Sequence, residues 1–589
     1  MNGLVPGSSG ATDTADISDT AVAAEEATLA ALLRCALREV AGPRGQTWRD
    51  GPYTLLRLAG TLLRVRTHGG LALRFTGPAE WRHDGRWRPL SSTRLVRLVE
   101  AELGGGEEEF AAQVGSSRRA MAALLAARRP AAAPADPWLA SEQALVFGHP
   151  FHPSPKARGG PAGGPGGGTA TGAATETGTA TGIGTATGAG EAATGRADWL
   201  AYAPEAHASF PLRLLGVRSD VLAGAGQTAV LDALGEAPPG YALLPAHPWQ
   251  LDLLAAELAA PLADGRLVDL GYGSRPAVPT SSVRTVYAPE IDRCLKFSLD
   301  VRITNCVRKN SWYELAGAVE LTTRLEPVFR RLAEEFPGTR WLPEPGYRSA
   351  GLGTRLLEGL SVIVRESPLR VCGPGVTPLL GGALAAAPLP PAAAADPVRW
   401  WRAYVECVAP PVLEAYLAHG VVLEPHLQNV LVGVDGSGTP VRAVFRDLEG
   451  TKLVAGRHDL SALPSRVAEA LTYDADSGWN RVVYCLVVNH LAEIAAALAG
   501  TGPVHGLWAV AGRVLAGYAA ARGWPPPLAD LLTGASLPAK ANLAVRWSRA
   551  ADRAAGYVPV ANPLAFPSAD PSAGPAPDAS PRVHAAGAR

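Results

Sequence analysis

The order of apolar and polar residues predicts helices and then a β-hairpin in the opening part of the chain. Apolar residues recur at helical spacing in residues 21–40, AVAAEEATLAALLRCALREV. The segment TLLRVRTHGGLALRF then has the pattern of two strands that turn at His68–Gly70. Further helices are expected between Thr93 and Arg129.

The middle of the chain is predicted to be rich in strands. Two strands are expected in RTVYAPEIDRCLKFSLDVRI, joined near Pro289–Asp292. Apolar and polar residues alternate over 295–302, which predicts a half-buried strand with its polar side chains on one face. A long amphipathic helix is expected from Trp312 to Phe336.

The last third is predicted to be mainly helical. DPVRWWRAYVECVAPPVLEAYLAHG favours a helix that bends at Pro410–Pro411 and stops at Gly420. VVLEPHLQNVLVG and VRAVFRDLEGTKL favour strands, and WNRVVYCLVVNHLAEIAAALAG favours a later helix.

Composition divides the chain into segments. Residues 159–195 are rich in Ala, Thr and Gly with a TATG repeat, so they offer little apolar surface against the entropy of ordering and are expected to form a flexible insertion. The expected organisation is a disordered leader at 1–20, an N-terminal region at 21–136, a strand-rich region at 137–394, a helical domain at 395–562 and a disordered tail at 563–589.

Charge and cysteine content exclude several classes of protein. Lys plus Arg and Asp plus Glu both number 54, so bulk electrostatics gives no basis for binding nucleic acid or an anionic membrane. The 6 cysteines form no C-x-x-C pair, which favours reduced thiols in a cytoplasmic protein. No secretory signal, membrane span, Walker A loop or G-x-S-x-G elbow is apparent.

The segment from Glu424 to Gly450 carries the most informative polar residues. His426, Asn429 and, after a strand, Asp447 resemble the catalytic loop and metal-binding Asp of kinase-like phosphotransferases. Mg²⁺ prefers carboxylate and amide oxygens, so Asn429 and Asp447 are candidate ligands, with Glu424 or Glu449 nearby. The alternative is that Asn429 caps a turn and Asp447 pairs with Arg446 at the surface.

A second group of hydroxyl and cationic side chains lies between residues 279 and 308. Arg284 and Lys296 are candidates to contact phosphate oxygens, and Arg308 can bind a carboxylate with two N–H groups. Ser282 and Thr304 add neutral donors. The alternative is an exposed strand face with ordinary cations.

A third candidate is the Pro-stiffened loop GHPFHPSPKARGG, which includes Lys156 and Arg158. Two His and two cations suit an anion, although a rigid surface loop is the alternative, and the His pair lacks a third zinc ligand. His247, in AHPWQ, is interpreted as a core histidine.

From about Pro137 to Trp547 the chain resembles the IucA/IucC family of NRPS-independent siderophore synthetases. The resemblance rests on five motifs that occur in the family's order, namely GHPFHPSPKARGG, PTSSVRTVY, KFSLDVRITNCVR, EPHLQN and FRDLEGTKL. The resemblance implies an α+β fold like a cupped hand, with thumb, fingers and a distantly kinase-like palm, matching 21–136, 137–394 and 395–562. It also implies ATP and Mg²⁺ as cofactors and adenylation of citrate or a related carboxylic acid. An amine or hydroxyl co-substrate then attacks to form an amide or ester.

The resemblance also assigns roles to residues. Arg308, His426 and Thr304 are expected around the reacting groups, and Asp447, Glu424 and Glu449 at the metal. The expected nucleotide-binding residues are Lys156, Arg158, Ser282, Arg284, Lys296, Gln428 and Asn429.

Two other functions stay open on the residues alone. One is a kinase-like small-molecule phosphotransferase, and the other is a non-catalytic carboxylate- or siderophore-binding protein. No nucleic-acid or membrane partner is expected, and family members are often homodimers. Whether His426 orients the carboxylate or accepts a proton is left undecided at this point.

Overall fold

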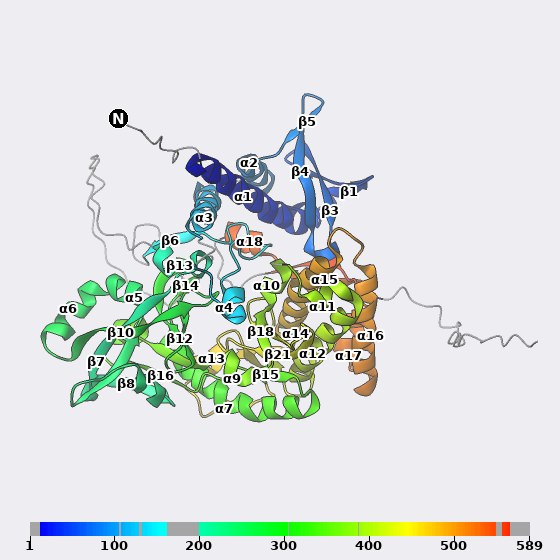
Figure 1. Ribbon diagram of the computed structural model, residues 1–589. Coiled ribbons are helices and arrows are strands. Elements are labelled where there is room, and N and C mark those ends of the chain that lie inside the picture. The colour runs from blue at the N-terminus through cyan, green and yellow to red at the C-terminus, as the bar shows by residue number, and fades with distance from the viewer. Residues whose placement is uncertain are drawn as a thin grey trace, which may run out of the picture.

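The computed structural model of the protein describes residues 12–104, 108–128, 132–161, 199–303, 306–386, 388–548 and 556–565. The chain forms three bodies, coloured mainly blue, cyan to green, and green to orange in Figure 1. Each body has its own large cluster of buried apolar residues. Helices and strands both contribute throughout, so the fold is of the mixed α/β kind.

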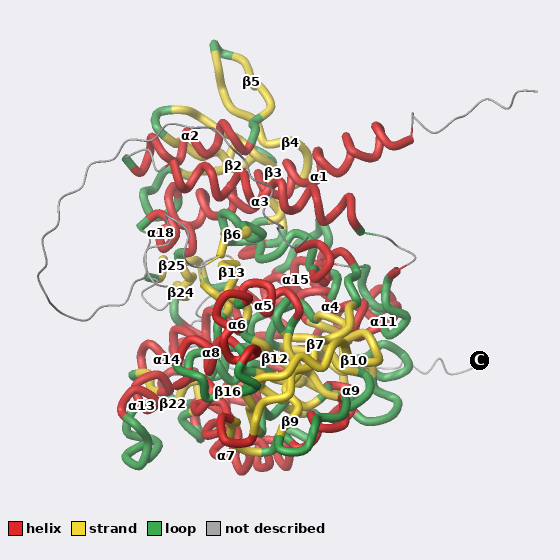
Figure 2. Tube along the Cα trace, turned by 90° about the vertical axis from the view of Figure 1, so that its left-hand side faces the viewer, coloured by secondary structure: helices red, strands yellow, loops and turns green. Residues whose placement is uncertain are grey.

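The N-terminal body is a five-stranded antiparallel sheet, in the order β1-β2-β3-β4-β5, packed against helices. Strand β3 pairs with β4 so that His68 lies opposite Arg74, which confirms the predicted hairpin. The sheet extends away from the other bodies in Figure 2. The elements of this body are α1 (Thr12–Cys35), η1 (Ala36–Ala41), β1 (Thr47–Asp50), β2 (Tyr53–Leu58), β3 (Thr61–His68), η2 (Gly70–Ala72), β4 (Arg74–His83), β5 (Arg86–Pro89), α2 (Ser92–Leu103) and α3 (Glu108–Ala127).

The disordered leader expected at residues 1–20 is wrong for its second part, because α1 already begins at Thr12. Residues 1–11 lie outside the described part of the chain. One face of the helix is buried from Ala24 onward, and helix growth is cooperative once a nucleus exists. Burial downstream can therefore extend a helix into polar sequence that would not be helical alone.

The middle body is built on an eight-stranded sheet in the order β8-β16-β17-β12-β11-β10-β7-β9, beside a three-stranded sheet β14-β13-β6. Its elements are α4 (Pro137–Glu142), β6 (Arg158–Pro161), η4 (Trp199–Tyr202), η5 (Pro204–Ala206), β7 (Phe210–Arg218), η6 (Ser219–Val221), β8 (Leu222–Gly226), η7 (Ala229–Leu234), β9 (Tyr241–Ala246), α5 (Pro248–Leu253), α6 (Ala255–Ala263), β10 (Leu267–Pro279), β11 (Thr285–Ala288), β12 (Arg293–Phe297), β13 (Leu299–Ile303), β14 (Cys306–Arg308), β16 (Gly346–Ala350), α8 (Thr354–Gly359) and β17 (Val362–Glu366).

Two predictions for this body need correction. The single strand expected over 295–302 is two strands in different sheets, which separate at Ser298. Three of its polar side chains are buried rather than solvated, with Lys296 at 2%, Ser298 at 1% and Asp300 at 4% exposure. Alternation of polar and apolar residues shows that the two faces of a strand have different surroundings. It does not show whether the polar face lies against water or against a buried polar site. The insertion expected from residue 159 starts later, since 158–161 form β6 and pair with β13; residues 162–195 of the insertion lie outside the described residues.

The C-terminal body packs long helices on a four-stranded sheet in the order β15-β21-β20-β18. Its elements are α7 (Trp312–Glu335), β15 (Thr339–Trp341), α9 (Pro368–Cys372), β18 (Thr377–Leu380), α10 (Gly381–Ala386), α11 (Pro391–Ala395), α12 (Pro397–Leu417), β19 (Val421–Val422), β20 (Val430–Val434), β21 (Pro440–Phe445), β22 (Lys452–Val454), α13 (Ser465–Leu471), β23 (Thr472–Tyr473), α14 (Ala475–Val483), η8 (Tyr484–Leu491), α15 (Ala492–Ala499), α16 (His505–Ala521), α17 (Pro526–Thr533), β24 (Ser536–Lys540) and β25 (Tyr557–Ala561).

The predicted domain boundary at 394/395 is therefore wrong. Strands β15 and β18 and the core-facing residues of α7 come from before residue 394 but belong to the C-terminal body. Strand pairing joins residues far apart in sequence, so composition along the chain does not reveal such a boundary. The long amphipathic helix itself is confirmed as α7, ending one residue before Phe336.

One continuous helical run, Ala475–Ala499, is long and apolar enough to cross a membrane by length and composition. Inside the protein 83% of its most apolar window is buried, as is typical of a core helix.

A helix from late in the chain packs into the N-terminal body. Helix α18 (Asn542–Trp547) places Leu543 in the N-terminal core, and Glu39 accepts hydrogen bonds from the backbone N–H groups of Leu543 (2.7 Å) and Ala544 (3.1 Å). The tail expected from 563 starts later, because Leu564 is 2% exposed in the C-terminal core. Residues 566–589 lie outside the described part.

Candidate active site

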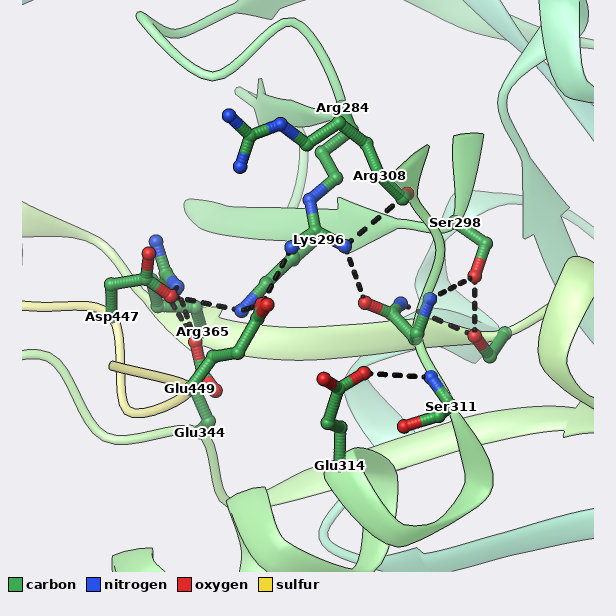
Figure 3. Close-up of polar contacts among 12 residues, drawn as sticks. Arg284, Lys296, Ser298, Arg308, Ser311, Glu314, Glu344, Arg365, Asp447 and Glu449 are labelled. Carbon is green, nitrogen blue, oxygen red and sulfur yellow. Dashed lines mark hydrogen bonds and ion pairs between the residues drawn. The ribbon is translucent and has the colours of Figure 1, made fainter. Parts of the chain in front are cut away.

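Lys296 is the centre of a buried group of charges between the middle and C-terminal bodies (Figure 3). Its side chain leaves β12, and Nζ lies 2.9 Å from Oδ1 of Asp447 and 3.0 Å from Oε2 of Glu449. Burial lowers the pKa of Lys296, but the Asp447, Glu344 and Glu449 carboxylates outweigh burial and raise that pKa above its usual value. The side chain is therefore a permanent cation, as the nucleotide-binding prediction requires.

Arg284 joins the same group from the turn between β10 and β11. Its guanidinium donates to Glu449 Oε2 (2.6 Å), to the Asn310 side-chain oxygen (2.7 Å) and to the Arg308 carbonyl oxygen (3.3 Å). The turn is closed by two hydrogen bonds that Thr280 donates to the Thr285 carbonyl oxygen, one from its backbone N–H (2.8 Å) and one from its hydroxyl (2.9 Å). A tight turn that presents backbone and hydroxyl groups beside a buried guanidinium suits the contact with phosphate oxygens predicted for Ser282 and Arg284.

Asp447 is held in a strained conformation by cations. Its φ is +73°, in the left-handed region that is unfavourable for residues other than glycine. Its Oδ1 also accepts a hydrogen bond from Arg365 at 3.2 Å, and Arg365 is ion-paired with buried Glu344. Burial raises the pKa of Asp447, but Lys296 and Arg365 hold that pKa well below its usual range. Asp447 is therefore an ionised carboxylate whose position is fixed by its partners.

Glu449 completes the cluster of opposite charges. Burial raises its pKa, but Lys296 and Arg284 lower it to about 2. Nearby Glu314 is in the reverse situation, because burial and the charge of Glu449 raise its pKa. Glu314 also forms a capping box with Ser311 at the start of α7, which fixes its place (Figure 3).

The turn before β20 brings the other predicted palm residues to the same edge of the sheet. Strands β20 and β21 are antiparallel with Val430 opposite Phe445, so Asn429 and Asp447 lie at one end of the pair, as predicted. Asn429 is buried, and its backbone N–H donates to the carbonyl oxygen of His426 at 2.8 Å. The local sequence thus folds as a turn that presents the His426 and Asn429 side chains together.

The protonation state of His426 follows from its backbone contacts. Nδ1 accepts a hydrogen bond from the backbone N–H of Gln428 at 3.2 Å. A neutral imidazole carries one proton, so the proton is on Nε2. Burial lowers the pKa of His426, although Glu424 and Asp447 oppose that effect. His426 therefore presents a neutral Nε2–H donor.

Arg446 does not pair with Asp447, contrary to the surface alternative. It forms a bidentate ion pair with Glu142, with N–O distances of 2.5 and 3.0 Å. It also donates to the Gln428 carbonyl oxygen at 2.7 Å. The side chain of Gln428 in turn donates to the Ser281 carbonyl oxygen at 3.0 Å.

The predicted metal ligands are only partly brought together. Asp447 and Glu449 share Lys296, whereas Glu424 is ion-paired with Arg481. Within the described ranges, no group of three or more His, Cys, Asp or Glu side chains is placed to hold a metal ion. Two carboxylates still fit Mg²⁺, which is usually bound through one or two carboxylates together with substrate phosphates.

The remaining predicted residues divide into three cases. Lys156 is buried and its ammonium group is ion-paired with Glu205. Thr304 lies outside the described residues, and for Arg158 only the backbone, in β6, is described. Arg308 is half-buried beside Arg284. His247 is 1% exposed, in agreement with the core interpretation, and this burial lowers its pKa to about 3.

Two family models match consecutive parts of the chain. The model described as "IucA / IucC family" matches residues 190–386, and the model described as "Ferric iron reductase FhuF-like transporter" matches residues 398–555. The rhizobactin siderophore biosynthesis protein RhbC of Rhizobium meliloti is 29% identical over 509 residues, which is 79% of this chain and 78% of that protein. The chain is therefore similar to the IucA/IucC family over residues 190–386.

Other relatives extend the comparison. The L-2,3-diaminopropanoate–citrate ligase of Staphylococcus aureus is 28% identical over 61% of this chain and 62% of its own length. The structure of ATP-bound aerobactin synthetase IucA from Klebsiella pneumoniae has a TM-score of 0.73 and 23% identity, and the match covers 92% of this chain and 99% of that one. Petrobactin biosynthesis protein AsbB of Bacillus anthracis has the same TM-score with 17% identity and 95% coverage of this chain.

Several residues of the site were not foreseen from sequence. Glu344 and Arg365 fix Asp447, Asn310 fixes Arg284, and Glu142 pairs with Arg446. Their only sequence signal is that each is a charged or amide residue. Such residues are common, so this signal alone does not identify a site.

Proposed function

We propose that the protein is an ATP-dependent siderophore synthetase that adenylates a carboxyl group of citrate or a related acid. It then condenses the activated acid with an amine or hydroxyl compound. The observation that carries this proposal is the buried set of Lys296, Arg284 and Arg365 around Asp447 and Glu449, in a chain similar to the IucA/IucC family. Relatives named as citrate ligases and a structural neighbour described with ATP support it.

In the adenylation step, a carboxylate oxygen attacks the α-phosphorus and pyrophosphate leaves. Negative charge grows on the phosphoryl oxygens and on the leaving group, next to a second anion. Lys296 and Arg284 are held in place before substrate arrives, so they stabilise that charge without reorganising. A bound Mg²⁺ would neutralise part of the phosphate charge, and Asp447 and Glu449 are the residues that would hold it.

His426 orients the acid in this proposal and does not accept the proton. Its Nδ1 is already occupied by the Gln428 backbone N–H, and its Nε2 carries a proton. An Nε2–H group donates to a carboxylate or phosphoryl oxygen. The proton released by the attacking amine therefore goes to another group or to solvent.

The wider description is also a proposal. We assign the N-terminal, middle and C-terminal bodies to the thumb, fingers and kinase-like palm of a cupped hand. The clusters of buried residues, one for each body, support this division. A cytoplasmic location and a homodimer remain predictions, as does the absence of nucleic-acid and membrane partners.

The test is acid-dependent ATP cleavage by the purified protein. A panel of citrate, citrate monoamides and dicarboxylates is offered with hydroxylamine, and nucleotides and hydroxamates are quantified. The proposal expects AMP, pyrophosphate and a hydroxamate for at least one acid. Release of ADP would instead indicate a phosphotransferase, and no cleavage with any acid would favour a binding protein.

A further inference from the structure

The ion pair between Glu142 and Arg446 borders the candidate active site but takes no part in the proposed chemistry. Glu142, at the end of α4, is fully buried. Besides the two bonds from Arg446, its carboxylate accepts hydrogen bonds from the Trp138 indole (3.0 Å) and the Ser281 backbone N–H (3.1 Å). The buried Glu142 carboxylate therefore accepts four hydrogen bonds, from Trp138, Ser281 and Arg446.

Arg446 is similarly satisfied on its other sides. Its Nε and Nη2 both donate to the Gln428 carbonyl oxygen, at 3.0 and 2.7 Å, and Nη2 donates to the Ser281 hydroxyl at 3.1 Å. The planar guanidinium fork therefore holds two backbone segments and one carboxylate in a fixed geometry. The Gln428 side chain closes the network by donating to the Ser281 carbonyl oxygen.

Each member of this network is close in sequence to a residue of the site. Ser281 precedes Ser282 and Arg284, which belong to the middle body, and Gln428 precedes Asn429. Arg446 precedes Asp447, whose left-handed φ needs support from its surroundings. The network thus ties the turn that carries the cations to the strand ends that carry the carboxylates.

We propose that the Glu142–Arg446 ion pair is a positioning device that sets the spacing between these two halves of the site. This inference rests on the proposed function for its catalytic consequence. A buried ion pair is weak evidence for stability, because desolvating two charges offsets much of their attraction. The rigid bidentate geometry, in contrast, fixes where Arg284 and Asp447 lie relative to each other.

The experiment compares Glu142→Gln, Arg446→Lys and the double variant with the unaltered protein. Arg446→Lys keeps both charges and loses only the fork, so it is the variant least disturbing to folding. Arg348→Lys is the matched control, since buried Arg348 holds Asp232 with two N–H groups and donates to the Leu243 carbonyl oxygen in the middle body. Thermal midpoints, calorimetric affinity for Mg²⁺ and α,β-methylene-ATP, and acid-dependent kcat are measured for all five proteins.

Each single variant is expected to lower kcat by about 100-fold, the effect of misplacing reacting groups by about 1 Å. Affinity for the analogue is expected to fall by about tenfold, because binding must then align the two halves. The double variant should lose no more than the worse single variant, since both side chains act as one unit. Arg348→Lys should stay within about threefold in both measurements.

Losses that match those of Arg348→Lys at equal thermal midpoints would overturn the inference. So would multiplied losses in the double variant. If the unaltered protein fails to cleave ATP with every acid tested, the proposed function is wrong. The calorimetric comparison of the variants still decides whether the ion pair positions the site.

Discussion

The carboxylate of Asp447 and the ammonium group of Lys296 lie 2.9 Å apart, although 151 residues separate them. One comes from the end of β21 and the other from β12, so the contact joins two sheets of different bodies. Lys296 contacts Glu449 as well, at 3.0 Å. A single buried side chain thus neutralises both carboxylates to which we assign the metal.

Replacing Lys296 with Met should abolish acid-dependent AMP release and destabilise the protein. The change removes a phosphate-facing cation and leaves two carboxylates less compensated, so we expect at least 100-fold lower kcat and about 3 kcal/mol lower unfolding free energy. Hydroxamate assays and urea unfolding measure these effects. Lys309→Met is the control, because Lys309 pairs with Glu358; it should keep activity within about threefold. Equal losses in the two variants would contradict the special place of Lys296.

Acid should weaken the fold through Glu449. Its pKa in the folded protein is about 2, below the usual 4.5, so its ionised form stabilises the fold above pH 4.5. That contribution is lost as the pH falls from about 4.5 to 2. Unfolding free energy measured in urea at several pH values should therefore be higher for the unaltered protein than for Glu449→Gln at pH 7, and the difference should shrink toward pH 2. A difference independent of pH would refute this assignment.

If His426 acts as a hydrogen-bond donor through Nε2, the variants His426→Gln and His426→Asn should differ in activity. The Gln amide nitrogen reaches the place of Nε2, whereas that of Asn reaches the place of Nδ1. His426→Gln should keep activity within about tenfold, while His426→Asn and His426→Ala should lose about 100-fold or more. Activity is measured from pH 6 to 9 with hydroxylamine as the nucleophile. If all three variants fail equally in the condensation step alone, His426 is a base after all.

A side chain at Gly450 should displace the carboxylate of Glu424. A methyl group there would overlap Oε2 of Glu424, which is ion-paired with Arg481. Gly450→Ala should lower unfolding free energy by about 1–3 kcal/mol through overpacking and reduce activity. Gly436→Ala is the matched control, since open space surrounds that position, and it should be neutral. Equal thermal midpoints for the two variants would show that Glu424 moves aside freely.

The sequence was most informative about site residues that are close to each other along the chain or lie on adjacent strands. The turn at 426–429 and the strands around it fold as their pattern predicts, and Asn429 and Asp447 lie at the same end of the β20–β21 pair. The motifs also place Lys296 and Arg284 in one cluster, which the structure bears out. Periodicity and motif order therefore captured the residues that lie next to each other in sequence or on paired strands.

Partners that come from distant segments were not predictable in this way. Arg365 lies on β17, which pairs with β12, and it contacts both Asp447 and Glu344, while Glu142 reaches Arg446 across 304 residues. The Glu424 metal assignment did not anticipate its ion pair with Arg481, which lies on α14. In each case, the partner of a charged side chain is determined by tertiary packing, because many residues of the same type elsewhere in the sequence could have paired with it.

The contact between Glu39 and α18 has a consequence for how the chain is made. Leu543 and Trp547 fill part of the N-terminal core, 504 residues after the carboxylate that caps their helix. During synthesis the packing of the N-terminal body therefore stays incomplete until residues 542–547 have left the ribosome. Premature termination anywhere upstream of residue 542 would thus leave the earliest-made part of the molecule incomplete as well as the latest.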